Sequence, residues 1–388
     1  MAKHFHLPVP SFFPHHISRQ IKELYWSRAI MDFAVASVAL FEPIYLYTLG
    51  YSLQIILLFY IEVYIVYFII LPVGAKYANR FGFEHSMTLS TIFLVGYYLS
   101  LYAIGSSPIF LVIAPLFFAI NKSLYWTGYH ADFAKYSDGK ERGKQVAEMD
   151  AIDSLVYIVG PLVGGAILAI WNFNILFIIA AILIMCSSIP LLTTKEKFKI
   201  QKFDYQESYQ RLFSKKNRRK LFAYIGFGEE LVVMVIWPIF IYVVVTNFFS
   251  VGMVVALATF TTTIIALYIG KLADKKSKRG IVRFGAISST FIWLIRIIAT
   301  AGWHVFIIDS FSRITKRTIA VPLMAMTYDR AQKHNVMKSI VNFELALVVG
   351  KLLAAMVIFI LLFFFPASWG FTIAFIIGGS MTLLYVLL

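Results

Sequence analysis

The sequence predicts an all-α polytopic membrane protein with twelve transmembrane helices. Apolar residues make up 60% of the 388 residues, charged residues make up 14%, and the mean hydropathy is +0.78. Stretches of about twenty apolar residues recur along the chain, and a helix of that length crosses a hydrocarbon core of ~30 Å. Backbone amides in hydrocarbon must bond within a helix or a closed barrel, and segments this long and continuously apolar favour helices.

Turn residues separate the apolar stretches and define the spans in order. The breaks on one side of the membrane fall at Gly50, Gly105 to Pro108, Trp171 to Asn174, Asn247 to Ser250, Gly302 and Pro366 to Gly370. The twelve predicted spans are residues 27–49, 52–75, 85–104, 108–130, 146–170, 173–192, 221–245, 250–270, 282–301, 303–327, 338–364 and 370–388. They form two six-helix halves, 25–192 and 221–388, with a tail at 1–24 and a linker at 193–220.

The basic residues support this count and orient the protein. Six Lys or Arg lie deep in spans, and the other 29 of the 35 lie in the tail, in the loops of one side or at the adjoining span ends. The short turns of the other side have none. Because basic loops remain cytoplasmic, we expect both termini on the cytoplasmic side of a plasma membrane. The net charge of +15 reflects this topology, so we expect no nucleic-acid partner.

The two halves resemble each other across the basic linker. Thr193 to Lys220 holds ten Lys or Arg against three acidic residues. Pro43 and Pro238 lie in similar apolar sequences and are 195 residues apart, as are Asn79 and Asp274. Two matches at one offset predict a duplicated unit.

Two loops carry a motif of a known family. Gly74-Ala-Lys-Tyr-Ala-Asn79-Arg80-Phe-Gly82 follows the second span, and Gly270-Lys-Leu-Ala-Asp274-Lys-Lys-Ser-Lys-Arg279 follows the eighth. Both resemble the signature loop of the major facilitator superfamily, Gly-x-Leu-Ala-Asp-Arg-x-Gly-Arg-Arg, which occurs once per half. Arg142 opens the fifth span, and Gly160-Pro161 follows eighteen residues later, which is similar to the fifth helix of that superfamily.

This resemblance implies a secondary transporter with a 6+6 pseudo-two-fold fold and alternating access. In the family the signature loop is a charged latch between the halves, but Asn79 replaces the first Asp here. A fuller form of the Gly160-Pro161 motif marks antiporters, which hints at export, while close helix packing is the alternative. The residues expected to serve gating are Asn79, Arg80, Gly82, Arg142, Gly160, Pro161, Gly270 and Asp274.

Charged residues within spans predict the cavity. An ionisable side chain at the bilayer centre costs at least ~2.5–3.5 kcal/mol on insertion scales, so such residues usually face a polar interior. Spans one, four, seven and ten are expected to line this interior. The candidates for the substrate and coupling cavity are Asp32, Lys122, Trp126, Tyr129, Glu229, Glu230, Arg313 and Lys351. Structural ion pairs and helix packing are the alternatives. Arg313, Lys316 and Arg317 share a basic face, which suits an anionic or amphipathic solute.

Glu229 and Glu230 are the first candidates for proton coupling. They lie about ten residues into span seven, which at ~1.5 Å per residue is ~15 Å deep. A buried carboxylate that exchanges cationic partners takes up and releases a proton. The alternative is a permanent ion pair with Arg296, Arg313 or Lys351, and Asp32 is then the next candidate.

Two other classes of membrane protein, channels and enzymes, have characteristic sequence features. A channel would call for a filter or a ring of like residues, and neither is apparent. A membrane-embedded enzyme acting on lipids would call for a catalytic motif such as HExxH or GxSxG, and the carboxylates are scattered instead. The sequence also lacks the phosphate loop of an ATP-driven pump. We therefore expect a monomeric transporter in the lipid bilayer, not an enzyme, that moves a small-molecule substrate with protons or another coupling ion and needs no cofactor or metal.

Overall fold

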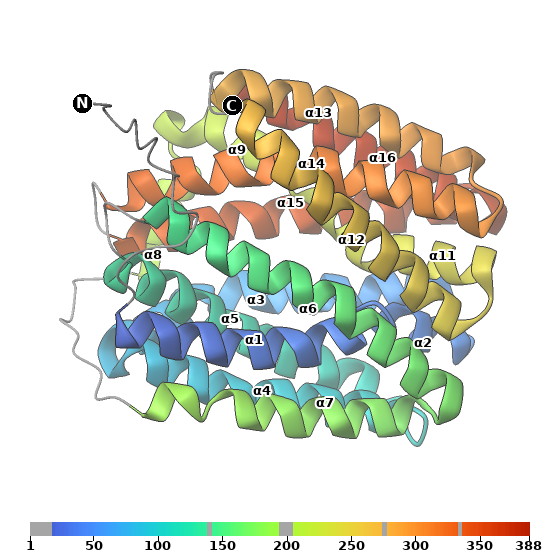
Figure 1. The fold of residues 1–388 in the computed structure, drawn as a ribbon, viewed down its shortest axis with the longest axis horizontal. Coiled ribbons are helices and arrows are strands. Elements are labelled where there is room, and N and C mark those ends of the chain that lie inside the picture. The colour runs from blue at the N-terminus through green and yellow to red at the C-terminus, as the bar shows by residue number, and fades with distance from the viewer. Residues whose placement is uncertain (1–17, 138–141, 194–204, 274–277, 333–335) are drawn as a thin grey trace, which may run out of the picture.

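The computed structural model describes residues 18–137, 142–193, 205–273, 278–332 and 336–388, and all regular structure within these ranges is helical (Figure 1). The first half contains α1 (Arg19–Ala39), α2 (Glu42–Thr48), α3 (Leu53–Phe81), α4 (Phe83–Ile104), α5 (Phe110–Tyr136), α6 (Arg142–Ile170) and α7 (Phe173–Ser187). The linker contains α8 (Tyr205–Leu212). The second half contains α9 (Arg218–Ile225), α10 (Gly228–Leu231), α11 (Trp237–Val245), α12 (Phe248–Ala273), α13 (Lys278–Ile295), α14 (Gly302–Gln332), α15 (Val336–Phe364) and α16 (Gly370–Leu383).

The predicted all-α polytopic fold is confirmed, since each of the twelve spans falls on helical backbone. Ten helical segments in the described ranges are long and apolar enough to cross a membrane. The α12 helix adds a shorter apolar stretch, Phe248–Ile264. The α14 helix is long enough, but its predicted span, 303–327, carries four charged residues, Asp309, Arg313, Lys316 and Arg317.

The predicted boundaries are wrong near the signature loops. Helix α3 continues to Phe81 and α12 to Ala273, so most of each motif is helical. The turn from α3 to α4 is Gly82 alone, with a φ of 115° that favours glycine. The linker also contains α8, a helix that the sequence analysis did not predict.

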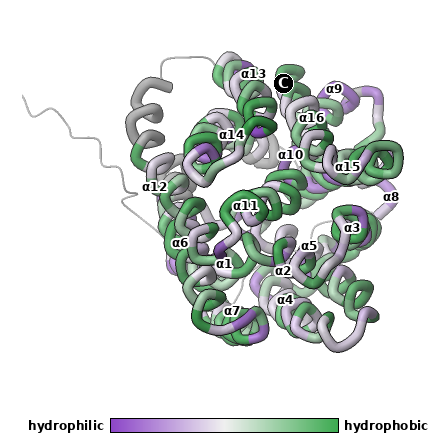
Figure 2. Tube along the Cα trace, turned by 90° about the vertical axis from the view of Figure 1, so that its right-hand side faces the viewer, coloured by the Kyte–Doolittle hydropathy of each residue, from purple (hydrophilic) through white to green (hydrophobic). Residues whose placement is uncertain are grey.

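Equivalent helix pairs pack in both halves, as a pseudo-two-fold relation requires. In the first half α4 packs on α5 and α7, α3 on α5, and α1 on α6. In the second half α13 packs on α14 and α16, α12 on α14, and α10 on α15. The halves meet where α6 packs on α12 and where α3 packs on α15 (Figure 2). In the pseudo-two-fold relation α6 corresponds to α15, and α3 corresponds to α12. The two seams are therefore equivalent.

Large apolar side chains cover the outside of this bundle. Ile92, Phe284 and Phe364 are 66%, 69% and 77% exposed. Apolar groups on such a surface are stable against lipid tails and unfavourable against water. The start of α1, the helices α8 and α9, and the C-terminal end of the chain lie at one end of the bundle, called here the linker end (Figure 1). It corresponds to the side predicted to be cytoplasmic.

Candidate substrate and coupling site

The seventh predicted span is interrupted where its two carboxylates lie. Between Ile225 and Trp237 the chain passes through the single turn of α10 and a π-helix, Val232–Ile236. Gly228 lies so close to α15 that a Cβ there would be 3.0 Å from the Cβ of Ala354. Irregular helical backbone at membrane depth occurs where it lines a cavity or packs on protein, and π-turns are frequent at functional sites. This span therefore has the local form of a binding segment.

Two lysines from α14 and α15 pair with the two glutamates of α10. Glu229 forms an ion pair with Lys316, and Glu230 lies 3.1 Å from the same ammonium group. The second carboxylate oxygen of Glu230 lies 3.0 Å from the ammonium group of Lys351. Lys316 also donates a hydrogen bond to the Tyr385 hydroxyl at 3.3 Å. Lys351 was a predicted partner of these glutamates, whereas Lys316 was not. The resulting network balances two negative charges with two positive charges.

Two carboxylates share one guanidinium group in the first half. Arg28 of α1 lies 2.9 Å from Asp32 of the same helix and 3.0 Å from Asp153 of α6. The guanidinium carbon stands 4.4 Å from the ring centroid of Tyr129 and 5.8 Å from that of Trp126. Asp153 was not among the residues predicted for the site. Sequence reasoning missed Arg28, although its i, i+4 spacing from Asp32 was a usable signal.

Lys122 of α5 is half-buried and contacts aromatic rings. Its ammonium group lies 4.6 Å from the ring centroid of Phe118 and 5.8 Å from that of Tyr64. Lys351 lies 5.6 Å from the same Tyr64 ring, so cations of both halves meet at one side chain of α3. Lys122 forms no ion pair with a carboxylate in the described ranges. Its charge is thus available for an anionic group of a ligand.

Polar contacts between the halves lie beside these clusters. Glu344 of α15 lies 3.3 Å from Nε2 of His130 on α5, and it accepts a hydrogen bond from the Tyr67 hydroxyl of α3 at 2.9 Å. Arg317 of α14 donates to the Ser154 hydroxyl of α6 at 2.8 Å. Neither Glu344 nor Arg317 was among the residues predicted for the site. Any movement of one half against the other changes these contacts.

Arg313 is held within its own half. Its Nε lies 2.7 Å from Oδ2 of Asp309, whose other oxygen accepts a hydrogen bond from the Trp237 indole at 2.9 Å. Arg296 lies beside this pair, with its guanidinium group 4.3 Å from the Trp237 ring and 3.7 Å from the Trp293 ring. The three basic residues of the face predicted on α14 therefore have three different sets of partners.

The small residues of the fifth-span motif pack helices together. A Cβ at Gly160 would lie 2.6 Å from the Cβ of Ala36, so α6 approaches α1 closely there. On the adjacent side, a Cβ at Gly252 of α12 would lie 3.0 Å from the carbonyl carbon of Pro161. These contacts support the packing interpretation of the motif.

The signature-loop residues lie at the linker end. Asn79 is buried at the end of α3, while Arg80 is exposed and its guanidinium group lies 5.3 Å from the Phe81 ring. Gly82 forms the turn described above. Gly270 is within α12 and Arg142 begins α6 in regions whose side chains the structure does not describe, and Asp274 lies outside the described residues.

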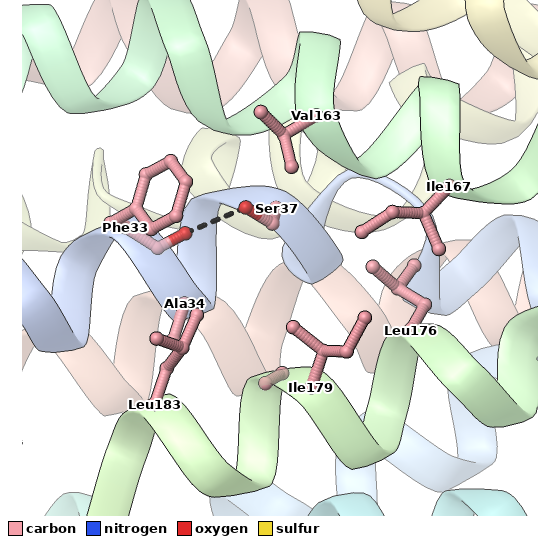
Figure 3. A pocket seen from close by; sticks show the side chains of 9 residues that line it. Phe33, Ala34, Ser37, Val163, Ile167, Leu176, Ile179 and Leu183 are labelled. Atoms are coloured by element: carbon pink, nitrogen blue, oxygen red, sulfur yellow. Dashed lines mark hydrogen bonds between the residues drawn. The ribbon is translucent and has the colours of Figure 1, made fainter. Parts of the chain in front are cut away.

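A small cavity among α1, α6 and α7 is separate from the candidate site (Figure 3). Its volume is about 20 Å³, and none of its lining residues is charged. The Ser37 hydroxyl at its wall donates to the Phe33 carbonyl at 2.8 Å. This space is close to the minimum for one water molecule, so it is too small for a solute.

The structure has two matching halves of six spans each, with ion pairs where the seventh span is interrupted. This arrangement is typical of a polytopic membrane protein of the transporter class. The family model of the Major Facilitator Superfamily matches residues 24–250, which is more than half of the chain. The chain therefore belongs to this superfamily and is a membrane transporter, as the loop motifs indicated. A search of curated proteins finds no match for it.

Proposed function

We propose that this chain is a secondary active transporter that moves a small anionic or amphipathic solute through the plasma membrane by alternating access and uses protons as the coupling ion. We also propose export as the direction; its support is the resemblance of Gly160-Pro161 to the antiporter motif, since the contacts of these residues are those of helix packing. The observation that carries the proposal is the position of Lys122, a half-buried ammonium group without an ion-pair partner in the described ranges, beside the Tyr64 ring that Lys351 of the other half also contacts.

Lys122 is the proposed contact for a negative group of the solute. The nearby positive charges of Lys316 and Lys351 are already neutralised by Glu229 and Glu230. An additional anion would gain little from these paired lysines. It would gain most from Lys122, since an unpaired charge in a low-dielectric interior interacts strongly with a counter-charge.

Charge balance makes Asp32 the first candidate for the coupling proton. Glu229 and Glu230 have two lysines between them, whereas Asp32 and Asp153 share Arg28 alone in the described part of the chain. Two carboxylates that share one cation away from water favour a state in which one of them is protonated. We therefore propose that Asp32 takes up the coupling proton in one state of the transporter and releases it in the other.

A search for the solute comes first. We would measure the thermal stability of the purified protein with panels of carboxylates, phosphates, amphipathic anions and matched cations. Binding at a hundred times the dissociation constant stabilises the folded state by about 2.7 kcal/mol. We expect anions to stabilise the wild type and Lys122→Arg, and to stabilise Lys122→Gln much less. Equal stabilisation of all three proteins by cations or neutral solutes would refute the assigned role of Lys122.

Driven transport is then measured in proteoliposomes with a pH gradient and the solute found in the screen. We expect Asp32→Asn to equilibrate the solute without accumulating it. Glu62→Gln is the matched control, because Glu62 also carries a carboxyl group within a span. Glu62 lies between Leu58 and Ile65 on α3, and the side chains of these two neighbours are exposed on the outside of the bundle. Accumulation by Asp32→Asn at the wild-type level would refute proton coupling at this residue.

A further inference from the structure

The linker helix α8 contacts both halves at the linker end. It packs on α3 of the first half and on α15 of the second half (Figure 2). Its two tyrosines, Tyr205 and Tyr209, are four residues apart and therefore lie on one face of the helix. Both hydroxyl groups reach backbone carbonyls of α3. The linker is thus more than a tether between the halves.

Pro72 explains why a tyrosine is needed at this position. Proline has no amide hydrogen, so Pro72 leaves the Phe68 carbonyl, four residues earlier in α3, without its helical donor. The Tyr209 hydroxyl donates to that carbonyl at 2.8 Å and lies 3.1 Å from the next one, of Ile69. The Tyr205 hydroxyl donates to the Ile69 carbonyl at 2.9 Å. A freed carbonyl at membrane depth requires such a donor from a neighbouring segment.

Ring packing and ionisation state support the same contact. The rings of Tyr209 and Phe68 have centroids 5.3 Å apart at an angle of 61°, an edge-to-face arrangement. Burial, with a smaller effect of the Tyr205 hydroxyl, raises the pKa of Tyr209. The hydroxyl group therefore keeps its proton near neutral pH and remains a donor.

The other side of α8 is attached to α15. Glu207 lies 2.5 Å from the ammonium group of Lys338, which stands in the first turn of α15. Leu212, at the end of α8, is 1% exposed and fixes the helix by apolar contact. One short helix therefore holds α3 through its tyrosines and α15 through its carboxylate.

We propose that α8 is a clasp across the seam between α3 and α15, and that the transporter opens at the linker end only when α8 releases one of these helices. The Tyr67–Glu344 hydrogen bond crosses the same seam one residue before Phe68, so the clasp extends an existing contact between the halves. The first signature loop has Asn79 in place of the acidic latch residue, and α8 provides a connection at that end. The consequence for transport rests on the proposed function, but the clasp itself is testable without a solute.

The test measures the separation of α3 and α15 by dipolar EPR. Spin labels at Lys76 and Ser339 of the full-length protein, in a Cys186→Ser background, report the ratio of open to closed populations. Loss of one hydrogen bond, about 1 kcal/mol, changes such a ratio about fivefold. We expect Tyr209→Phe to raise the open population by about that factor. Tyr205→Phe is the matched control, and we expect less than about a twofold change because the Ile69 carbonyl keeps a helical donor.

Pro72→Ala tests the reason for the contact. An alanine at this position would supply the amide that the Phe68 carbonyl lacks, so Tyr209→Phe should then have less than about half its effect. An equal effect of Tyr209→Phe with and without Pro72, or no effect in either background, would overturn the proposal.

A charge swap tests the attachment to α15 without altering the tyrosines. Glu207→Lys should raise the open population, and adding Lys338→Glu should restore the wild-type ratio. Failure of the swap to restore it would also overturn the clasp. If the distances change as expected but no solute is transported in proteoliposomes, the clasp stands and the proposed function fails.

Discussion

Replacing Arg28 with methionine tests the ion-pair cluster of the first half. Methionine keeps most of the apolar stem and removes the charge. Breaking a buried ion pair by removing one partner costs about 3–5 kcal/mol, since the other charge remains in the interior. In the described ranges, the Oδ2 atom of Asp32 is buried and has Arg28 as its one partner. The side chain of Asp153 is 21% exposed and therefore retains some access to solvent. We therefore expect Arg28→Met to lower the free energy of unfolding by about 3 kcal/mol, the lower end of this range, mostly because of the buried charge left on Asp32.

Denaturant unfolding in detergent micelles, followed by circular dichroism, measures this loss. Arg19→Met is the matched control, because Arg19 is on the same helix and pairs with Glu23, but its side chain is 69% exposed, so we expect less than about 1 kcal/mol. Adding Asp32→Asn to Arg28→Met should restore at least about 2 kcal/mol of the free energy of unfolding, because it removes the charge left without a partner. A cost of Arg28→Met similar to that of Arg19→Met, or no recovery with Asp32→Asn, would refute the reasoning.

Two further predictions concern topology and packing. In a Cys186→Ser background, a cysteine at Ser106 should react with an impermeant thiol reagent added outside intact cells. A cysteine at Ser214 should not react, because basic loops are retained inside. Labelling at Ser214 would reverse the predicted orientation. Gly160→Leu should destabilise the protein by about 1–3 kcal/mol, since the α1–α6 contact has no space for a side chain. Val159→Leu, on the exposed side of α6, should change the stability by less than about 0.5 kcal/mol. Equal effects of the two variants in an unfolding titration would show that α6 does not pack as described.

The number of spans could be predicted from the sequence because the bilayer fixes the length of every helix. The helix ends at the linker end could not be predicted in the same way. Gly74 was assigned to the first signature loop, but the missing Cβ makes room for Ser123 of α5, so this glycine serves close helix packing inside α3. A glycine that serves a turn and one that serves packing look the same in a single sequence, and only the neighbouring helix distinguishes them.

The charged residues of the candidate site could be predicted, but their partners could not. Charges within apolar spans are conspicuous, which is why Asp32, Glu229 and Lys351 were selected. Which cation faces which carboxylate depends on how helices pack across long separations, and Lys316 is 87 residues from Glu229. Arg28 was missed for a different reason, because its place near the start of the first span made it resemble a residue of the basic tail.

The described ion pairs within each half are stronger than the hydrogen bonds between the halves, which agrees with the alternating access proposed above. The described ion pairs inside each half, such as Arg28 with Asp32 and Glu230 with Lys351, are largely removed from water, and breaking one would cost about 3–5 kcal/mol. The contacts that cross between the halves include the hydrogen bonds from Tyr67 and Arg317, which contribute about 0.5–3 kcal/mol each, and the contact of Glu344 with His130 at 3.3 Å. Under the proposed mechanism, two states that differ by a few such bonds lie within reach of a solute or a proton, and only the seams between the halves rearrange.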